Sequence, residues 1–324
     1  MTPAYSIKEI GSKLRVLLEK AVKKNLAEGI LLSGGLDTSI LAVITSKFTS
    51  LKAFTVALRG APAPDIGYAK FIAEHLGLKH LIYNFDENTL SEALPNVIKI
   101  TKSYDPMEIR NSVAIFLALK FAKNHGVNTI MSGDGCDELF AGYSFLFNLR
   151  KNRLGRELQK LWETMSFSSI PLAEAFKMKV KLPYLDPEFK SFATEIDPRY
   201  KVRSEKGQIW GKWILRKSFE NILPKEIVWR AKTPIEYGSG TTILPNLFNE
   251  KIPNQEFERK QRKYLGKDKV TIRDKEQLFY YEIFRQVIGV PHPYNPQART
   301  CPQCNSNVPN DATYCRTCGA YPIR

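Results

Sequence analysis

The chain has 324 residues, of which 43% are hydrophobic and 25% charged, values that are typical of a folded globular protein. No apolar run is long enough to span a bilayer and the first residues lack the apolar core of a signal peptide, so we expect a cytoplasmic protein with no membrane partner. The formal net charge is +15, with most of the excess after residue 150. Such a basic half can hold phosphate backbones, although solvated lysine surfaces are also common.

Residues 5–26 are predicted to form an amphipathic helix, because apolar residues recur there at helical spacing. Apolar strands then alternate with helices as far as residue 131. The expected strands are 29–32, 51–58, 80–85 and 127–131, and the expected helices are 37–48, 65–76, 88–101 and 111–125. This alternation predicts an α/β fold with a parallel sheet, helices on both faces, and ligands beyond the carboxyl ends of the strands.

After about residue 151 the strand signal fades into helical stretches that prolines interrupt. The polar and basic segment 253–270 is predicted to be a mobile excursion, and 275–290 a last amphipathic helix. The proline-rich segment 291–296 is predicted to be an extended linker. The predicted organisation is therefore an α/β domain (1–150), a mostly helical region (151–290), the linker (291–296) and a cysteine-containing module (297–324).

The first chemical motif is SGGLDTS at residues 33–39, between the first predicted strand and its helix. Two glycines let the backbone turn sharply and approach a ligand, while hydroxyls and the free N–H groups of a helix N-terminus can hold phosphate. The lysine of a Walker loop and a GxGxxG segment are both missing. An ordinary turn in which Asp37 or Ser33 caps the helix would explain the same residues.

SGGLDTS resembles the pyrophosphate loop (SGGxDS) of the ATP pyrophosphatases, which split ATP between its α and β phosphates. Residues 132–143, SGDGCDELFAGY, look like the SGEGSDELFGGY element of asparagine synthetases and the related β-lactam-forming synthetases. Residues 182–186, LPYLD, resemble the VPFLD of that family. The resemblance covers roughly residues 1–290. It implies a pyrophosphate-loop (PP-loop) domain that binds ATP, at 1–150, and a synthetase region that completes the active site, at 151–290.

The resemblance also implies the site residues. Asp37 and Asp137 match the family's Mg²⁺-binding aspartates, and carboxylates suit that ion, although each alone could be a helix N-cap. Lys232 matches a catalytic lysine that reaches the phosphates, and Asp134 stands where asparagine synthetases carry a glutamate that could shuttle a proton. The ATP-binding positions implied are Leu31, Ser33, Gly34, Gly35, Asp37, Thr38, Ser39, Val56, Gly133 and Gly135.

Two further departures from the family pattern bear on the substrate and on the nitrogen source. Lys179 and Lys181 lie where the family commonly has an acid and an arginine, so the charge of the expected substrate region is reversed at Lys179. Lys212 and Arg216 match the family's KxxLR helix and are predicted to make structural contacts with the sheet. We also expect the family's N-terminal glutaminase domain to be missing, because the residues before the first motif are too few for it. Nitrogen is therefore expected as free ammonia, from a separate glutaminase, or from an amine.

The tail carries Cys301, Cys304, Cys315 and Cys318 as two CxxC pairs with ten residues between them. This spacing predicts a structural Zn²⁺ ion with four thiolate ligands, and a disulfide pair would fit a reducing compartment poorly. With no core of its own, this zinc ribbon should depend on the metal. We expect the linker to tether it, for recruitment and not for chemistry. Such ribbons bind RNA, DNA or protein.

These patterns favour an AMP-forming ligase that adenylates a carboxylate, after which ammonia or an amine attacks to give an amide. Two alternatives stay open. One is a tRNA-modifying enzyme that adenylates an RNA base and holds the tRNA with its basic half and the ribbon. The other is a non-catalytic, ATP-binding regulatory module.

Overall fold

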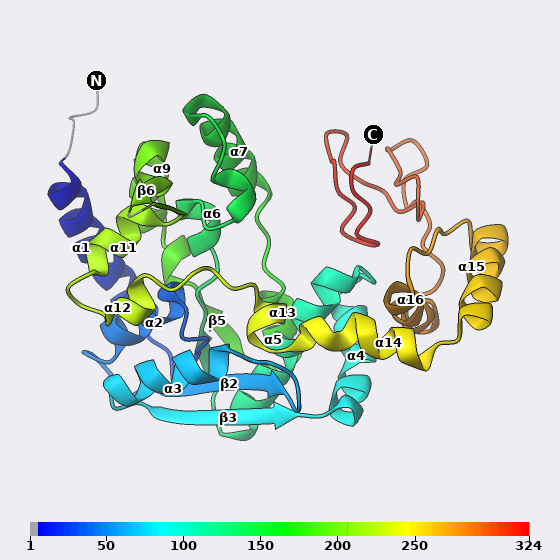
Figure 1. Ribbon diagram of the computed structural model, residues 1–324, viewed down its shortest axis with the longest axis horizontal. Coiled ribbons are helices and arrows are strands. Elements are labelled where there is room, and N and C mark those ends of the chain that lie inside the picture. Colours follow the sequence, from blue (N-terminus) through cyan, green and yellow to red (C-terminus); the bar gives the residue numbers. More distant parts are fainter. Residues whose placement is uncertain (1–5, 206, 324) are drawn as a thin grey trace. The chain divides into compact units, whose positions relative to one another are not determined.

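The computed structural model describes residues 6–205 and 207–323, and its central feature is a five-stranded sheet with the strand order β3-β2-β1-β4-β5 (Figure 1). β1 pairs in parallel with β2 and β4, and β4 pairs in parallel with β5. The strands are β1 (Gly29–Leu31), β2 (Lys52–Leu58), β3 (Lys79–Phe85), β4 (Thr129–Met131) and β5 (Lys179–Lys181). The predicted parallel α/β sheet is confirmed, and β5 adds an edge strand that the apolar pattern did not predict.

By contacts between residues, the chain divides into two compact units that each combine distant segments. Unit 1 comprises the described residues of 1–55, 64–83 and 121–234. Unit 2 comprises those of 56–63, 84–120 and 235–324. Each unit is therefore assembled by tertiary contacts and not by one continuous stretch of chain.

Unit 1 has a continuous apolar core in which α1, α2, α9, α11 and α12 take part. α1 begins after Ser6, which forms a capping box with Glu9, and its buried face includes Leu14 and Leu18. α1 lies along α9 and α11, as Figure 1 shows. Residue 5, where the predicted helix begins, lies outside the described residues. The helices are α1 (Ile7–Lys24), α2 (Leu36–Thr45), α3 (Asp65–His75), α6 (Cys136–Phe140), α7 (Lys151–Thr164), α8 (Ser169–Glu174), α9 (Pro187–Glu195), α10 (Pro198–Lys201), α11 (Trp213–Phe219) and α12 (Lys225–Val228).

Short elements complete unit 1. Unit 1 also contains two three-residue 3₁₀ helices. η1 (Ser144–Leu146) comes shortly after the loop of residues 132–138, and η2 (Pro183–Leu185) follows β5. The strands β6 (Arg203–Glu205) and β7 (Gln208–Trp210) form an antiparallel pair just before α11. The helical character that the sequence predicts beyond residue 151 is therefore present.

Unit 2 is largely helical, with α16 packed against α4 and α14. Its elements are α4 (Glu87–Thr101), most of α5 (Pro106–Asn124), α13 (Ile235–Gly238), η3 (Thr241–Ile243), α14 (Leu244–Lys251), α15 (Asn254–Asp268) and α16 (Lys275–Val287). The prediction of a mobile excursion at 253–270 is wrong, because α15 fills most of it. Lys260 Nζ lies 2.8 Å from Glu256 within the helix and 2.8 Å from Glu282 of α16, and Tyr264 donates to Glu282 at 2.7 Å. These polar contacts hold a helix with little apolar surface.

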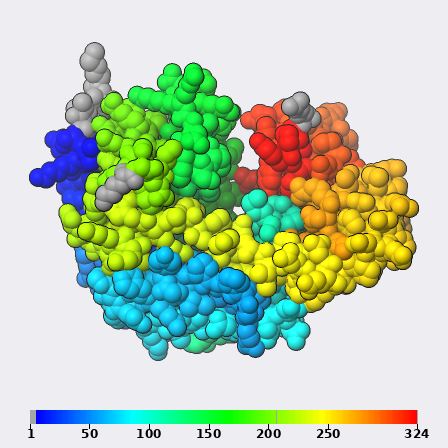
Figure 2. Space-filling model, viewed as in Figure 1, coloured from blue at the N-terminus to red at the C-terminus, as the bar shows by residue number. Residues whose placement is uncertain are grey.

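The C-terminal cysteine segment packs against other parts of unit 2, and the expectation that it serves recruitment stays a prediction. Ser103 Oγ donates to the Arg316 carbonyl at 2.7 Å, the Tyr104 N–H donates to the Thr317 carbonyl at 2.8 Å, and Gln277 Nε2 donates to the Cys318 carbonyl at 2.7 Å. Figure 2 shows the red C-terminal residues against the turquoise segment near α5. The preceding residues 291–296 contain no helix or strand, as the linker prediction requires.

Candidate active site

Two loops at the carboxyl ends of neighbouring strands come together in unit 1. The first loop, residues 33–39, follows β1 and is called the glycine loop here. The second, residues 132–138, follows β4 and is called the acidic loop, and the two strands pair side by side. A Cβ atom on Gly133 would lie 3.1 Å from the Cβ of Asp37 and 3.3 Å from Thr38 Cγ2, so a glycine allows the loops their close approach. The predicted meeting of the two loops at this edge of the sheet is therefore found.

Lys212 lies between the two aspartates that the loops supply. Its Nζ is 2.5 Å from Asp37 Oδ2 and 2.6 Å from Asp137 Oδ1, and its side chain is only 3% exposed. Lys212 directly precedes α11, and its backbone N–H donates to the Phe140 carbonyl. Arg216, by contrast, donates only to backbone carbonyls, including that of Arg230 at 3.0 Å. The hydrogen bonds that Arg216 donates therefore go to the backbone, whereas Lys212 joins the two aspartates, and the role predicted for the KxxLR helix stays a prediction.

A second lysine, Lys232, also forms an ion pair with Asp137. Lys232 Nζ donates to Asp137 Oδ2 at 2.7 Å and stays 32% exposed, so it is far more accessible to solvent than Lys212. Burial by itself would raise the pKa of Asp137, but the ammonium groups of Lys212 and Lys232 hold it well below its usual value. Burial likewise opposes the charge on Lys212, whose pKa the two carboxylates nevertheless raise. Asp137 and Lys212 are therefore both ionised at neutral pH.

Arg230 fastens the lysine-bearing segment to the glycine loop. Its guanidinium donates to the Ser33 carbonyl at 2.9 Å and to Asp65 Oδ1 at 2.5 Å, and it stacks over the Tyr68 ring at 4.0 Å from the centroid. Gly34 meets the same tyrosine: its φ is +65° and a Cβ there would lie 2.3 Å from the Tyr68 backbone. Only glycine fits this turn.

The third motif, LPYLD at residues 182–186, contacts the loop of residues 33–39 through Tyr184. Tyr184 is fully buried and its hydroxyl donates to the Asp37 carbonyl at 3.0 Å. Asp186 caps α9 by accepting the Glu188 N–H at 3.2 Å. LPYLD therefore positions the aspartate loop and starts a helix, and its acid belongs to the scaffold.

A cavity of about 50 Å³ opens among these groups. Four cationic side chains and two carboxylates line it, which suits a ligand that carries several negative charges together with a metal cation. The lining residues are Ser33, Gly35, Leu36, Asp37, Asp65, Lys212, Arg216, Arg230, Ala231, Lys232 and Thr233.

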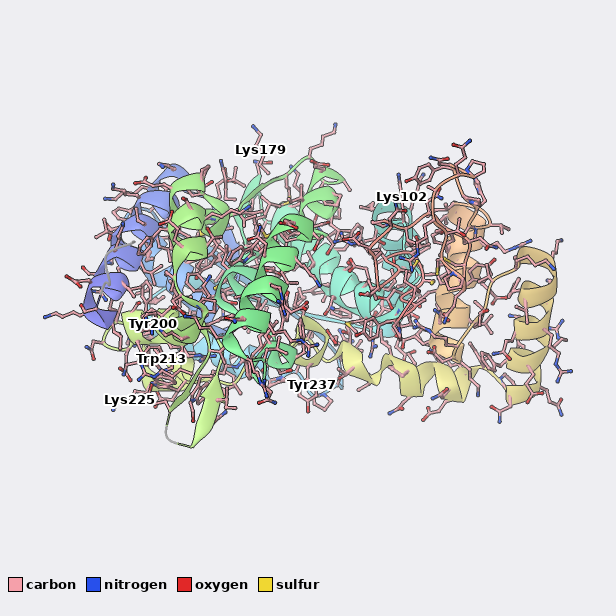
Figure 3. The ribbon with its side chains drawn as sticks, turned by 90° about the horizontal axis from the view of Figure 1, so that it is seen from above. Lys102, Lys179, Tyr200, Trp213, Lys225 and Tyr237 are labelled. Atoms are coloured by element: carbon pink, nitrogen blue, oxygen red, sulfur yellow. The ribbon has the colours of Figure 1, made fainter. Side chains whose placement is uncertain are left out.

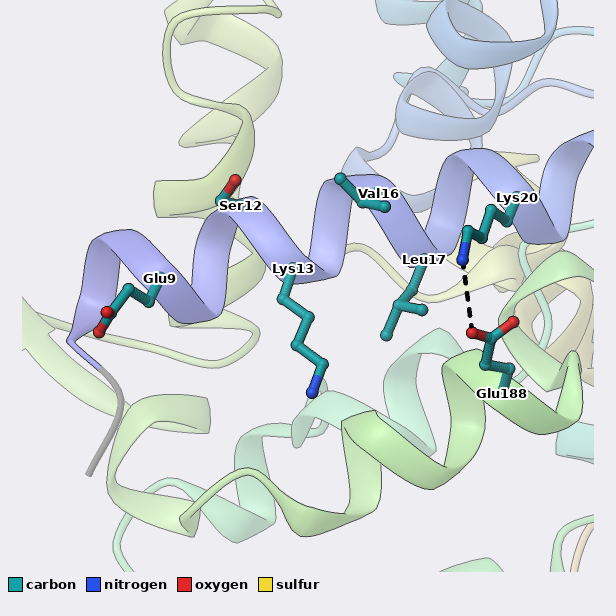
Figure 4. Close-up of a pocket in the computed structure, with 7 residues that line it drawn as sticks. All are labelled: Glu9, Ser12, Lys13, Val16, Leu17, Lys20 and Glu188. Carbon is teal, nitrogen blue, oxygen red and sulfur yellow. Dashed lines mark ion pairs between the residues drawn. The ribbon is translucent and has the colours of Figure 1, made fainter. Parts of the chain in front are cut away.

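A larger groove of about 520 Å³ lies on α1 and α9, where Figure 4 shows the Lys20–Glu188 ion pair across it. The two atoms are 3.6 Å apart and both side chains are at least half exposed. Exposed pairs of this kind contribute little energy, so we assign the chemistry to the smaller cavity, where the charges are buried. The groove residues are Glu9, Ser12, Lys13, Val16, Leu17, Lys20 and Glu188.

Asp134 has a partner that sequence reasoning missed. Ser169 Oγ, in α8, donates to Asp134 Oδ2 at 2.5 Å, and Ser169 is 1% exposed. Burial raises the pKa of Asp134, so this carboxyl can accept and return a proton more readily than an exposed aspartate. Nothing around Ser169 resembles a motif, and no sequence signal could have found it.

The remaining predicted ATP positions differ in where they lie. The hydroxyls of Ser33 and Thr38 are 3.2 Å apart at the mouth of the glycine loop. Ser39 is fully buried, and its hydroxyl has no hydrogen-bond partner among the described residues. Leu31 is the last residue of β1, and Val56 lies in the part of β2 that belongs to unit 2.

The two lysines of the expected substrate region lie at opposite ends of β5. The Lys181 carbonyl accepts the Ser132 N–H at 3.1 Å, which places Lys181 beside the acidic loop. Lys179 begins the strand and is exposed, and Figure 3 shows its side chain pointing away from the molecule. Because a strand advances about 3.3 Å per residue, Lys179 lies well back from the carboxyl edge.

The four tail cysteines form a cluster, as their spacing predicts. Their sulfurs all lie within 4.8 Å of one another, all four residues are buried, and all four thiols are free. Cys301 lies 3.7 Å from Cys318, and Cys304 lies 3.7 Å from Cys315. The donor set suits a four-coordinate metal ion.

The fold and this site define an α/β protein in which a glycine loop and an acidic loop meet at the carboxyl ends of parallel strands. The chain belongs to the asparagine synthase family, whose model matches residues 13–171 and 171–299. It is 34% identical over 253 residues to the nodule asparagine synthetase [glutamine-hydrolyzing] of Pisum sativum, a match that covers 70% of this chain and 42% of the relative.

Further relatives give the same result. The asparagine synthetase [glutamine-hydrolyzing] of Asparagus officinalis is 34% identical over 260 residues, covering 72% of this chain and 43% of that protein. The chain thus spans less than half the length of these relatives. The solved NMN synthetase of Francisella tularensis aligns loosely, with 15% identity, a TM-score of 0.38, and coverage of 90% of this chain and 99% of that one. In the part of the chain that the structure describes, no helix combines the length and apolarity needed to cross a bilayer.

Proposed function

We propose that this protein is an ATP-dependent, AMP-forming amide ligase that adenylates a carboxylate and then lets ammonia or an amine attack the adenylate. The observation that carries the proposal is the buried Asp37–Lys212–Asp137–Lys232 array at the meeting point of the two family loops. Membership of the asparagine synthase family supports the reaction type.

The acidic pair fits Mg²⁺. Asp37 Oδ1 is buried and lacks a hydrogen-bond partner among the described residues, so it offers a carboxylate oxygen, whereas Asp137 Oδ1 lies 2.6 Å from Lys212 Nζ and would be shared between the lysine and the ion. We propose that these two residues hold the ion, which when bound would neutralise phosphate charge and orient the triphosphate. Lys212 keeps the two carboxylates together, since at 2.5 and 2.6 Å it offsets their mutual repulsion.

Each remaining residue has a role that its surroundings support. The Ser33, Thr38 and Arg230 region would bind the phosphates, and Lys232, the partly exposed cation, would follow the charge that develops as pyrophosphate leaves. Asp134, held by Ser169, would take the proton of the attacking amine. Nitrogen would come from free ammonia, from a separate glutaminase or from an amine substrate.

The decisive experiment is product analysis with a carboxylate panel. Pyrophosphate exchange should depend on one carboxylate, and turnover should give AMP and pyrophosphate. ADP and phosphate would contradict the proposal, and ATP binding without any exchange would favour a regulatory module instead. Adding a glutaminase with glutamine, or ammonium alone, identifies the nitrogen source.

For the cysteine cluster we propose a structural Zn²⁺ ion. Four thiolates saturate its tetrahedral coordination, so the metal would stabilise the segment and take no part in catalysis. Free thiols are what a reducing compartment maintains, which supports a cytoplasmic location. Metal analysis of the purified chain should find one zinc per molecule, and its absence would contradict this assignment.

A tRNA partner is a second proposal, and α15 supports it. Arg259, Lys263 and Lys267 are exposed at intervals of four residues, so they form a row along one side of the helix. Replacing the three with glutamine should weaken tRNA binding and flatten its salt dependence. Unchanged binding in a filter assay would remove this surface as an RNA site.

A further inference from the structure

The second CxxC pair, Cys315 and Cys318, is held by residues that lie outside the cysteine segment of residues 297–324. Four successive backbone carbonyls, those of residues 316–319, accept hydrogen bonds from the rest of unit 2. The donors are the Ser103 hydroxyl to Arg316 at 2.7 Å, the Tyr104 N–H to Thr317 at 2.8 Å, Gln277 Nε2 to Cys318 at 2.7 Å, and the Arg273 guanidinium to Cys318 at 2.9 Å and to Gly319 at 2.6 Å. These contacts fix the backbone on both sides of Cys318.

The turn that follows Cys318 lies directly against Asp105, in the connection between α4 and α5. Gly319 has a φ of +75°, and a Cβ atom there would lie 2.0 Å from Asp105 Oδ1, so only glycine fits. The Tyr314 hydroxyl donates to the other oxygen of Asp105 at 2.5 Å. Since Tyr314 directly precedes Cys315, the buried Asp105 carboxyl contacts the chain before and after this cysteine pair.

The first pair, Cys301 and Cys304, is supported more from within the segment. The Cys301 N–H donates to the Ser306 carbonyl at 2.8 Å, and the Cys301 carbonyl accepts the Asn305 N–H at 2.9 Å. From the rest of unit 2, the Thr271 N–H donates to the Gln303 carbonyl at 2.8 Å. Among the described residues, unit 2 therefore holds the backbone of the second pair at more points than that of the first.

We propose that Ser103, Gln277 and Arg273 are positioning residues that hold Cys315 and Cys318 ready for the metal ion. The inference rests on the metal proposed above and goes beyond it, because metal affinity then depends on the α4–α5 connection and on the start of α16. Ligands that are already in place lose less conformational freedom on binding, and the loss of outer-shell hydrogen bonds typically lowers metal affinity about 10–100-fold. Because linkage is reciprocal, the bound ion in turn stabilises these parts of unit 2.

The test uses the full-length chain with Co²⁺ as the probe, since its absorption bands report on thiolate coordination. Arg273→Met keeps the aliphatic stem and removes the donors to Cys318 and Gly319, so it should bind Co²⁺ about tenfold more weakly in competition with a chelator. Arg273→Lys keeps the charge and a donor and should recover part of this loss. Ser103→Ala removes the donor to Arg316 and should weaken binding in the same direction.

Arg285→Met is the matched control. Arg285 lies at the other end of α16 with its side chain 33% exposed, against 35% for Arg273, but it donates to Asp268 at 2.8 Å and not to the cysteine segment. This control should lose stability while its cobalt affinity stays that of the wild type. An equal loss of cobalt affinity in Arg285→Met and Arg273→Met would overturn the inference, because general destabilisation would then explain both.

Hydrogen–deuterium exchange gives a second measurement, independent of substitution. The Tyr104 N–H donates to the Thr317 carbonyl, so metal loading should slow exchange in the peptide that contains Tyr104. Wild-type cobalt affinity in both Arg273→Met and Ser103→Ala, or exchange at Tyr104 that metal leaves unchanged, would overturn the inference. A wild-type chain without a four-thiolate cobalt spectrum would overturn the metal assignment itself, so the two failures can be told apart.

Discussion

The glycine-loop site of unit 1 and the cysteine cluster of unit 2 are built from the sequence in opposite ways. Lys212 meets Asp37 across 175 positions of chain, and Lys232 meets Asp137 across 95. The cysteine sulfurs that lie 3.7 Å apart are separated by only 17 and 11 positions. Spacing alone therefore fixes the second site, whereas the first depends on the complete fold of unit 1.

The two sites also differ in the chemistry of their side chains. The first site keeps three cations and three carboxylates close together in ion pairs: Lys212 with Asp37, Arg230 with Asp65, and Lys232 with Asp137. The second site holds four soft sulfurs with no lysine or carboxylate among the ligands. Groups that pair tightly and remain ionised suit chemistry on a charged nucleotide, and sulfurs that saturate a metal suit structure.

The largest effect should come from Asp137→Asn, which removes the carboxylate that both lysines share. Adenylation should fall by about 100–1,000-fold, because charge stabilisation of the transition state is typically the largest single catalytic contribution. Asp268→Asn is the matched control: Asp268 is buried in unit 2 and accepts from Arg285 at 2.8 Å. The control should lose stability and keep its rate of pyrophosphate exchange. Equal losses of pyrophosphate exchange in both variants would show that Asp137 has no special role in adenylation.

Within the glycine-loop site, Lys232 and Lys212 should differ in their effects on turnover and stability. Lys232→Ala should lower turnover by about 100-fold while ATP affinity changes much less, since this partly exposed cation acts mainly on developing charge. Lys212→Ala should lower stability as well, because it leaves Asp37 and Asp137 together without their buried counter-ion. Steady-state kinetics and thermal unfolding separate the two. Lys225→Ala, an exposed lysine of α12, is the control.

The sequence predicted the parts of each site that are encoded locally and missed those that depend on tertiary packing. The glycine loop, the acidic loop and the CxxC pairs are local patterns, and each has the neighbours that its motif implies. Lys212 and Ser169 could not be placed, because their partners are set by how α11 and α8 pack. β5 has three residues, too few for an apolar pattern, and α15 is held by ion pairs to α16, which a composition rich in lysine and glutamate does not reveal.

A third prediction concerns the one buried ammonium group of unit 1 that no acid neutralises among the described residues. Lys201 is 0% exposed, its Nζ has no hydrogen-bond partner there, and it lies over the Trp162 ring at 4.6 Å from the centroid. Burial lowers the pKa of Lys201 to about 7. Lys201→Met should therefore raise stability by a few kcal/mol at pH 6.5.

The sign of its pH dependence follows from linkage. Because the pKa of Lys201 is lower in the folded chain than in the unfolded one, the unfolded chain binds more protons between about pH 7 and pH 10. Wild-type stability should rise toward that of Lys201→Met across this range. Urea unfolding at pH 6.5 and 9.5 measures the gap, with Lys225→Met as the exposed control. A gap that does not shrink at high pH would show that folding does not lower the pKa of Lys201.

The smallest effect, and the most informative for the substrate, should separate Lys179 from Lys181. The sequence predicts that Lys179 shapes the second substrate, but it begins β5 and is exposed, whereas Lys181 ends the strand and its carbonyl accepts from Ser132 of the acidic loop. Side chains two residues apart in a strand point to the same face, so Lys179 and Lys181 differ mainly in their distance from the loop. We therefore propose that Lys181 contacts the substrate. Lys181→Glu should change the order of preference in a carboxylate panel several-fold while ATP affinity holds, and Lys179→Glu should leave that order unchanged. The reverse result would assign the substrate contact to Lys179 and would mean that the acceptor binds along β5 instead of at its carboxyl end.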